Sequence, residues 1–178
     1  MSNKNFYSDP KLHPKLLRCE SLTADAFAPF GEIISMDNAS AELINEGHTE
    51  KFADLAQIDT AEDGGRTAIH LFRSQPLTLP LLIEEMEKHP LSSQAFMPLH
   101  NRPFLVIVAP PGERVDSATV RAFITDGKQG INLRRGTWHH YQVSLVQESD
   151  HLVIDRVGPG RNLEEQQLDP VLLIQSLA

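Results

Sequence analysis

The chain has 178 residues, which suits one domain with a sizeable core. Its hydrophobic and charged fractions, 40% and 22%, are ordinary for a globular protein. The formal net charge of −8, without a basic stripe, argues against nucleic-acid and anionic-membrane partners. No stretch approaches the roughly 20 apolar residues of a membrane span, and the N-terminus lacks a signal-peptide pattern. Cys19 is the only cysteine, which excludes an internal disulfide and fits a reducing compartment, so we expect a cytoplasmic protein.

The first part of the chain contains one expected helix and two irregular stretches. Residues 1–17 are polar and predict a flexible N-terminal arm, and residues 18–178 are expected to form a single domain. Thr23 is placed to cap a short helix over residues 24–28. Residues 36–65 show no sustained period, and a segment of that length is usually functional or lies over a surface.

From Thr67 the pattern changes to the alternation of a strand. Ile69 and Leu71 share one face with Arg73. We interpret this face as the inward one, which would place Arg73 at the mouth of a barrel.

Residues 76–90 have the pattern of an amphipathic helix, with Leu82 and Met86 on one side and Pro90 at the end. The rest of the chain consists of short strand-like runs separated by Pro, Gly, Asp or Asn. These runs cover residues 93–99, 104–110, 119–125, 129–136, 138–147 and 151–157. Short strands with few helices predict a mainly all-β fold, an antiparallel β-barrel or sandwich with a few short helices. Residues 169–178 are apolar enough to dock on this body.

Two adjacent histidines form the most informative segment. In a strand that begins at Trp138, His139 and Tyr141 lie on the more apolar face, so His139 is expected to point into the barrel. His140 then faces outward or toward a partner subunit. A histidine pair also has an ordinary explanation, one core imidazole bound to a carbonyl and one solvated imidazole. The pattern alone leaves both open.

Two stretches resemble the motifs of cupin barrels. The second cupin motif, a glycine turn followed by an inward histidine, is matched by Gly130, Gly136 and His139. The first motif normally supplies two histidines and a glutamate, and EKHPLSSQAF stands at that place. Carboxylate, imidazole and amide oxygen can all bind a divalent ion, and imidazole suits nickel and zinc. The tentative metal ligands are therefore Glu87, His89, Gln94 and His139; alternatively, Glu87 and His89 merely finish an exposed helix.

Longer stretches are similar to the ureidoglycolate lyases, formerly called ureidoglycolate hydrolases, from about Leu22 to Asp169. The matching stretches are LTADAFAPFGEII, INEG followed by EKFADLA, FRSQP, LPLLIEEMEKHPLSSQAFMPL, VRAFITDGKQGIN and WHHYQVSL. The last three are long and specific. Where the family often has an Arg- or Tyr-rich stretch after the INxG motif, this chain has Lys51 and Phe52.

The resemblance implies a cupin-like antiparallel barrel that works as a homodimer. It implies cleavage of (S)-ureidoglycolate to glyoxylate and urea, in the branch of purine breakdown that uses allantoin as a nitrogen source. It also implies nickel or another divalent ion as cofactor and no organic cofactor. Ureidoglycolate is the expected partner, without nucleic acid or membrane.

The substrate carries a carboxylate, a hydroxyl and a ureido nitrogen on one carbon, and each group suggests a residue. Arg73 can clamp the carboxylate with its planar fork, although a lone arginine is more often in a surface ion pair. His139 is the leading base, or a ligand if a metal is present. Either Lys51 or His140 protonates the leaving nitrogen. Further candidates for contact with the substrate are Gln94, Asn132 and Tyr141, of which Asn132 suits a urea group.

Three other activities stay open from the sequence. One is a different metal-dependent cupin reaction, such as that of an isomerase or oxygenase. Another is a barrel that binds a ureide without turning it over. A third is a hydrolase acting on the same substrate, which would release ammonia and carbon dioxide in place of urea.

Overall fold

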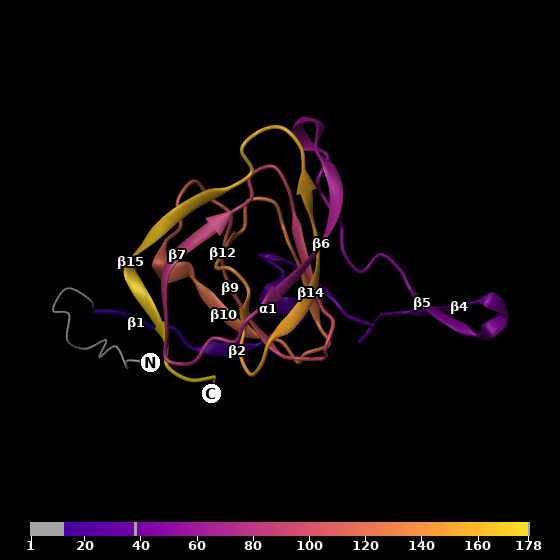
Figure 1. Ribbon diagram of the computed structural model, residues 1–178, viewed down its shortest axis with the longest axis horizontal. Helices are drawn as coiled ribbons and strands as arrows, with labels where there is room; N and C mark the ends of the chain where they lie inside the picture. The colour runs from indigo at the N-terminus through magenta and orange to yellow at the C-terminus, as the bar shows by residue number, and fades with distance from the viewer. Residues whose placement is uncertain (1–12, 38, 178) are drawn as a thin grey trace.

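A computed structural model describes residues 13–37 and 39–177 of the chain, and its body consists of two curled β-sheets (Figure 1). The larger sheet has eight strands in the order β1-β15-β7-β12-β9-β10-β2, with β13 also paired to β9. The smaller sheet has five strands in the order β3-β11-β8-β14-β6. A separate two-stranded hairpin, β4–β5, projects from this body (Figure 1).

The elements are short, as their turn-rich sequence predicts. The strands of the larger sheet are β1 (Lys15–Leu16), β2 (Cys19–Ser21), β7 (Leu81–Lys88), β9 (Phe104–Ala109), β10 (Arg121–Ile124), β12 (Trp138–His139), β13 (Val143–Ser144) and β15 (Glu164–Ile174). Those of the smaller sheet are β3 (Gly31–Ile34), β6 (Arg66–Ser74), β8 (Gln94–Pro98), β11 (Gly130–Leu133) and β14 (Ser149–Val157). The hairpin consists of β4 (Ala41–Ile44) and β5 (Thr49–Phe52). The helical elements are α1 (Ala24–Phe27) and the 3-10 turns η1 (Asn45–Gly47), η2 (Glu62–Gly64) and η3 (Ser117–Thr119).

The structure confirms the all-β prediction and most of the expected elements. The strand-like runs match β6, β8, β9, β10, β11 and β14, and the short helix is α1. Thr23 stands at the N-cap of α1, but its side chain caps no backbone amide. Of the arm expected over residues 1–17, residues 1–12 lie outside the described residues, while Lys15–Leu16 pairs with β15 as β1.

The amphipathic helix predicted over residues 76–90 is wrong, because this segment contains strand β7. β7 pairs along its length with β15 and at Glu87 with β12. These pairings join residues more than 50 positions apart, so no local pattern reveals them. Ile83 and Met86 are fully buried in the core, and the apolar positions that resembled a helical stripe therefore pack a strand.

The strand expected over residues 138–147 is interrupted. β12 ends at His139 and β13 begins at Val143, and both pair with β9. The interruption breaks the predicted alternation, because Trp138 is as buried as His139, while Tyr141 is 57% exposed. The irregular region 36–65 likewise contains a regular element that was not predicted, the β4–β5 hairpin.

Strand β9 separates two hydrophobic cores, because its side chains alternate between the faces of the larger sheet. Phe104, Val106 and Val108 pack between the two sheets, against residues of β8, β11 and β14. Leu105 and Ile107 pack on the other face, in the core that β7 and β15 cover.

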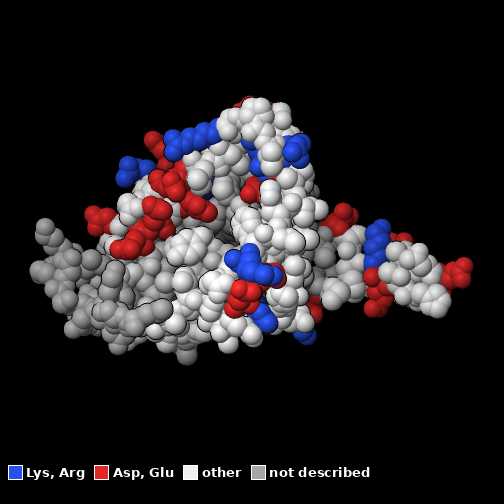
Figure 2. All heavy atoms as spheres, viewed as in Figure 1, with Lys and Arg blue, Asp and Glu red and all other residues white. Residues whose placement is uncertain are grey.

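Acidic side chains gather over β7 and β15 (Figure 2), in keeping with the negative net charge. Within the described ranges, no helix has the length and apolar character needed to cross a membrane.

Candidate metal centre and active site

Three metal-ligating side chains converge between β7 and β12. One ligand atom each of Glu87, His89 and His139 lies within 4.8 Å of the others. Glu87 is in β7, His89 follows the end of that strand, and His139 of β12 pairs directly with Glu87. Side chains two residues apart point to the same side of a strand, whereas in a helix they diverge. The strand geometry of β7 therefore brings together three of the four predicted metal ligands.

Backbone carbonyls orient both imidazoles toward this point. Nδ1 of His89 lies 2.7 Å from the carbonyl oxygen of Asn162, and Nδ1 of His139 lies 3.1 Å from that of Thr137. A carbonyl only accepts, so each Nδ1 carries the proton and each Nε2 presents a lone pair. Both Nε2 atoms are buried without a hydrogen-bond partner. Such a carbonyl–imidazole contact is the usual support of a metal-ligating histidine.

The electrostatics also suit a cation. His139 Nε2 is 3.3 Å from Glu87 Oε1, and a proton on this nitrogen would lower the pKa of Glu87 in spite of the carboxyl group's burial. Glu87 is therefore an anion at neutral pH. Two lone pairs and a carboxylate converging in a buried space repel one another unless a positive charge lies between them. Imidazole and carboxylate are ligands of divalent transition metals, so the donor set fits such an ion.

His140 lies beside the three ligands and is free to exchange a proton. It lines a small cavity together with Glu85, Met86, Glu87, His139 and Tyr141, and its ring contacts that of Tyr141 at 3.9 Å between centroids with a tilt of 38°. Its Nδ1 donates to the carbonyl oxygen of Tyr141 at 3.0 Å, which leaves the Nε2 lone pair available. Burial lowers the pKa of His140, so the ring is neutral at pH 7.

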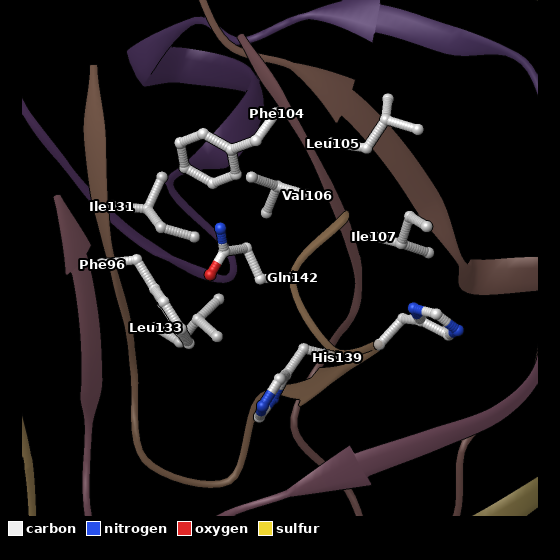
Figure 3. Close-up of a pocket in the computed structure, with 10 residues that line it drawn as sticks. Phe96, Phe104, Leu105, Val106, Ile107, Ile131, Leu133, His139 and Gln142 are labelled. Carbon is white, nitrogen blue, oxygen red and sulfur yellow. The ribbon is translucent and has the colours of Figure 1, made fainter. Parts of the chain in front are cut away.

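The interior wall next to His139 is apolar (Figure 3). Side chains from β8, β9 and β11 surround a void of about 10 Å³, room for about one water molecule. Gln142 points into this space and places its Nε2 2.8 Å from Nε2 of His151. His151 is completely buried, and burial lowers its pKa to about 4. Burial beside this dry wall therefore keeps His151 neutral at pH 7.

A wider cavity of about 350 Å³ is lined in part by His89. Its remaining lining residues are Asp155, Arg156, Arg161, Asn162 and Leu163. The guanidinium group of Arg156 is bound to the backbone carbonyls of Glu62, Asp63 and Pro159. Arg161 donates its Nε to the carbonyl oxygen of Leu163 and has no other bond to residues 13–37 and 39–177, so its two terminal nitrogens can meet an anion in the cavity.

Gln94 and Asn132 belong to the smaller sheet, and their roles as metal ligand or substrate contact stay predictions. Gln94 is on the facing sheet, where its Nε2 donates to Asp155 and its Oε1 is buried without a partner. Asn132 points to the outer side of that sheet, since its neighbours Ile131 and Leu133 belong to the core between the sheets. Glu32 and the carbonyl of Gln57 accept its amide hydrogens.

Arg73 and Lys51 are placed outside the barrel. The face of β6 that carries Arg73 is the outer one, since Ile69 and Leu71 are 68% and 71% exposed, and its interpretation as inward is wrong. Arg73 forms a two-pronged ion pair with Asp150. Lys51 is on the projecting hairpin, 3.6 Å from Glu42. Their catalytic roles stay predictions, and Lys51 reaches a site only if the hairpin meets another chain.

The supporting residues have no signal in the sequence. Asn162 stands 73 positions after His89, and it acts through a backbone carbonyl that every residue type offers. Asp155 and Arg161 line the wider cavity from segments that carry no recognisable motif. Only their position in the fold identifies them.

Comparison with known proteins places this site in a family. A profile described as ureidoglycolate lyase matches residues 14–175. A ureidoglycolate lyase of Burkholderia mallei is 51% identical over 154 residues, 86% of this chain and 90% of that protein. Ureidoglycolate lyase 1 of Rhizobium meliloti is 47% identical over 89% and 93% of the two chains, and a Pseudomonas syringae pv. tomato enzyme of the same name is 44% identical over 87% and 91%.

Among solved structures, a dTDP-4-dehydrorhamnose 3,5-epimerase from Elizabethkingia anophelis aligns with 74% of this chain and 72% of its own. The TM-score is 0.42 and the sequence identity 13%, so nothing about the site follows from it. The family profile is decisive, because residues 14–175 include every strand from β1 to β15 and all three converging ligands. The chain belongs to the ureidoglycolate lyase family.

Proposed function

We propose that this protein is a ureidoglycolate lyase that cleaves ureidoglycolate to glyoxylate and urea in the cytoplasm, and that it works as a homodimer. The observation that carries the proposal is the arrangement of His140 beside Glu87, His89 and His139, in a chain of this family. It combines an acid–base group with a cation site, and the cleavage needs both.

The reaction is an elimination that consumes no water. The hydroxyl proton leaves, the C–O bond becomes a carbonyl, the C–N bond breaks, and the urea nitrogen takes up a proton. His140 can perform both transfers, because its Nε2 accepts the hydroxyl proton and the resulting imidazolium returns it to the leaving nitrogen.

Glu87, His89 and His139 would hold a divalent ion, nickel by the family resemblance. Such an ion supplies Lewis acidity, which lowers the pKa of a bound hydroxyl group. The chain's own contribution is to keep both imidazoles in the ligating tautomer through the carbonyls of Asn162 and Thr137.

The substrate's carboxylate requires a cation, and Arg161 is the candidate in the wider cavity. Its terminal nitrogens have no partner in the part of the chain that the structure describes, and the cavity is also lined by the ligand His89. A guanidinium group binds a carboxylate through two parallel hydrogen bonds. Arg73, which the sequence favoured for this role, already binds Asp150 in this way.

Product identity tests the proposal. Purified protein is incubated with ureidoglycolate, with and without chelator, and urea, glyoxylate and ammonia are measured separately. Urea and glyoxylate in equal amounts above the spontaneous rate are expected, with activity lost on chelation and regained with added nickel. Ammonia in place of urea would show a hydrolase, and ligand binding without product would show a ureide-binding barrel. Full activity in metal-free protein would remove the ion from the proposal.

A further inference from the structure

The carboxylate of Asp155 lies on the wall of the wider cavity that His89 and Arg161 also line. Its side chain points between the two sheets, because Val153, two positions earlier in β14, packs in the core there. Asp155 is not one of the three converging ligands. Within residues 13–37 and 39–177 it forms no ion pair, and its hydrogen bonds come from Gln94 and Arg156. The cavity wall therefore carries a carboxylate that neither the cation site nor an ion pair accounts for.

Two donors fix the orientation of this carboxylate. Nε2 of Gln94 donates to one oxygen at 2.9 Å, and the backbone N–H of Arg156 donates to the other at 2.6 Å. The guanidinium group of Arg156 is bound to backbone carbonyls instead. A carboxylate has about four lone-pair sites, so each oxygen of Asp155 can accept a further N–H from a molecule in the cavity.

Gln94 keeps its orientation at the expense of its own hydrogen bonds. Its Oε1 is buried and has no partner among the described residues, and a buried acceptor without a donor is costly. The opposite orientation of the amide would set Oε1 against an oxygen of Asp155, where two acceptors repel each other. Gln94 is therefore a positioning residue, which acts by holding the carboxylate of Asp155.

Arg161 gives the same cavity a group of opposite character. It belongs to the loop that joins β14 of the smaller sheet to β15 of the larger one (Figure 1). Its terminal nitrogens, which have no partner in the described chain, only donate, whereas the carboxylate of Asp155 only accepts. A ureido acid carries the complementary pair of groups, because its carboxylate only accepts and its ureido nitrogens donate.

We propose that Asp155 is the specificity-determining residue for the ureido group. Its carboxylate accepts the N–H groups of the ureido nitrogens, while Arg161 binds the substrate's carboxylate. This inference rests on the proposed function and names the part of the substrate that the site distinguishes. A site built to accept an N–H rejects an analogue with a methyl group in that place, because its acceptor is then left unpaired.

Calorimetric binding of two matched ligands tests the role of Asp155 without turnover. N-carbamoylglycine is ureidoglycolate without its hydroxyl group, so it cannot be cleaved, and N-acetylglycine has a methyl group in place of the terminal amino group. The wild-type protein, as purified, should bind N-carbamoylglycine at least about tenfold more tightly. In Asp155→Asn this preference should fall below about threefold, because the amide lacks the negative charge and presents N–H groups of its own.

Three further variants separate recognition from folding. Arg161→Ala should weaken both ligands by the same factor and keep the preference, because both carry the carboxylate. Gln94→Leu, which releases the carboxylate of Asp155, should reduce the preference without weakening N-acetylglycine. The matched control is Asp150→Asn, the same change in the same strand at an ion pair with Arg73, and it should leave both affinities at the wild-type level. The near-UV signal of the buried Trp138 verifies the fold of each variant.

Equal binding of the two ligands by the wild type, or failure to bind either, would overturn the inference. So would an Asp155→Asn variant that binds both less tightly at an unchanged ratio, since that is the result of a structural role. The product assay distinguishes this outcome from the fate of the lyase activity. A preference that depends on Asp155 in a protein that releases no urea would keep the recognition and remove the reaction, whereas urea release without the preference would remove only the role of Asp155.

Discussion

His140 connects the cation site to the proton transfers. The carbonyl of Tyr141 fixes its tautomer, the apolar surroundings keep it neutral, and Glu87 and His139 line the same cavity. A nearby imidazole that is not itself a ligand can accept a proton without disturbing the ion. Loss of His140 should therefore impair proton transfer, whereas loss of His89 or His139 should impair metal binding.

Replacing His140 with glutamine should lower kcat/KM by about 10²- to 10⁴-fold, the usual contribution of a general acid–base group. Because its pKa is lowered, His140 is neutral at pH 7 and becomes protonated only as the pH falls below the ordinary histidine range. Wild-type kcat/KM should therefore decline on the acid side, and the variant should lack this decline. Metal content by mass spectrometry should stay at the wild-type level, whereas His89→Ala should lose the metal. Loss of metal from His140→Gln would make it a ligand and refute the acid–base role.

Arg161 and Arg73 can be distinguished by matched alanine substitutions. Arg161→Ala should raise KM about tenfold or more, because a charged hydrogen bond to the substrate's carboxylate is worth about 1.5–3 kcal/mol, and Arg161→Lys should recover part of the loss. Arg73→Ala removes an exposed ion pair, so it should leave the kinetics near wild type and change the unfolding free energy by at most about 1 kcal/mol. A raised KM in Arg73→Ala with an unchanged KM in Arg161→Ala would show that Arg73, and not Arg161, binds the substrate's carboxylate.

At the scale of elements, β14 links the two faces of the smaller sheet. His151, Val153 and Asp155 face inward, while Leu152 and Ile154 face outward. His151 is the most buried polar side chain of this strand. The ring of Phe104 packs edge-on against its imidazole, with 4.9 Å between the ring centroids. Its lowered pKa makes the fold sensitive to acid.

The pH dependence of folding follows from the two pKa values of His151. In the unfolded chain it takes up a proton near pH 6.5, and in the folded protein only near pH 4. Between these values the unfolded state binds more protons, so stability falls as the pH falls, by up to about 3 kcal/mol for this group. In urea unfolding, the difference between pH 7 and pH 4.5 should be about 2 kcal/mol smaller in His151→Asn than in the wild type. His48→Asn, at an exposed histidine of the β4–β5 hairpin, should leave the difference unchanged, and equal differences in all three proteins would contradict the assignment.

On the scale of the whole molecule, the site depends on contacts between distant segments. β7 and β12 supply the three ligands, the loop before β15 supplies the carbonyl that orients His89, and β9 with the smaller sheet supplies the dry wall. The β4–β5 hairpin stands outside this assembly. The site is therefore not confined to one sequence segment.

The sequence by itself determined the fold class, most strands and the family. Alternating side chains and closely spaced turn residues are local features, and they correctly predict β6, β8 to β11 and β14. The motifs around EKHPLSSQAF and WHHYQ also identified three ligands that the structure brings within 4.8 Å.

Only the tertiary structure decided which face of each strand is buried and what lies beside it. The pattern of β7 suits a helix as well as a strand, and pairing with β12 and β15 settles the choice. Alternation identified the two faces of β6 but not which one is inward, so Arg73 was placed at the mouth of the barrel. Burial depends on the packing of whole sheets, and this information is distributed over the chain rather than contained in any segment.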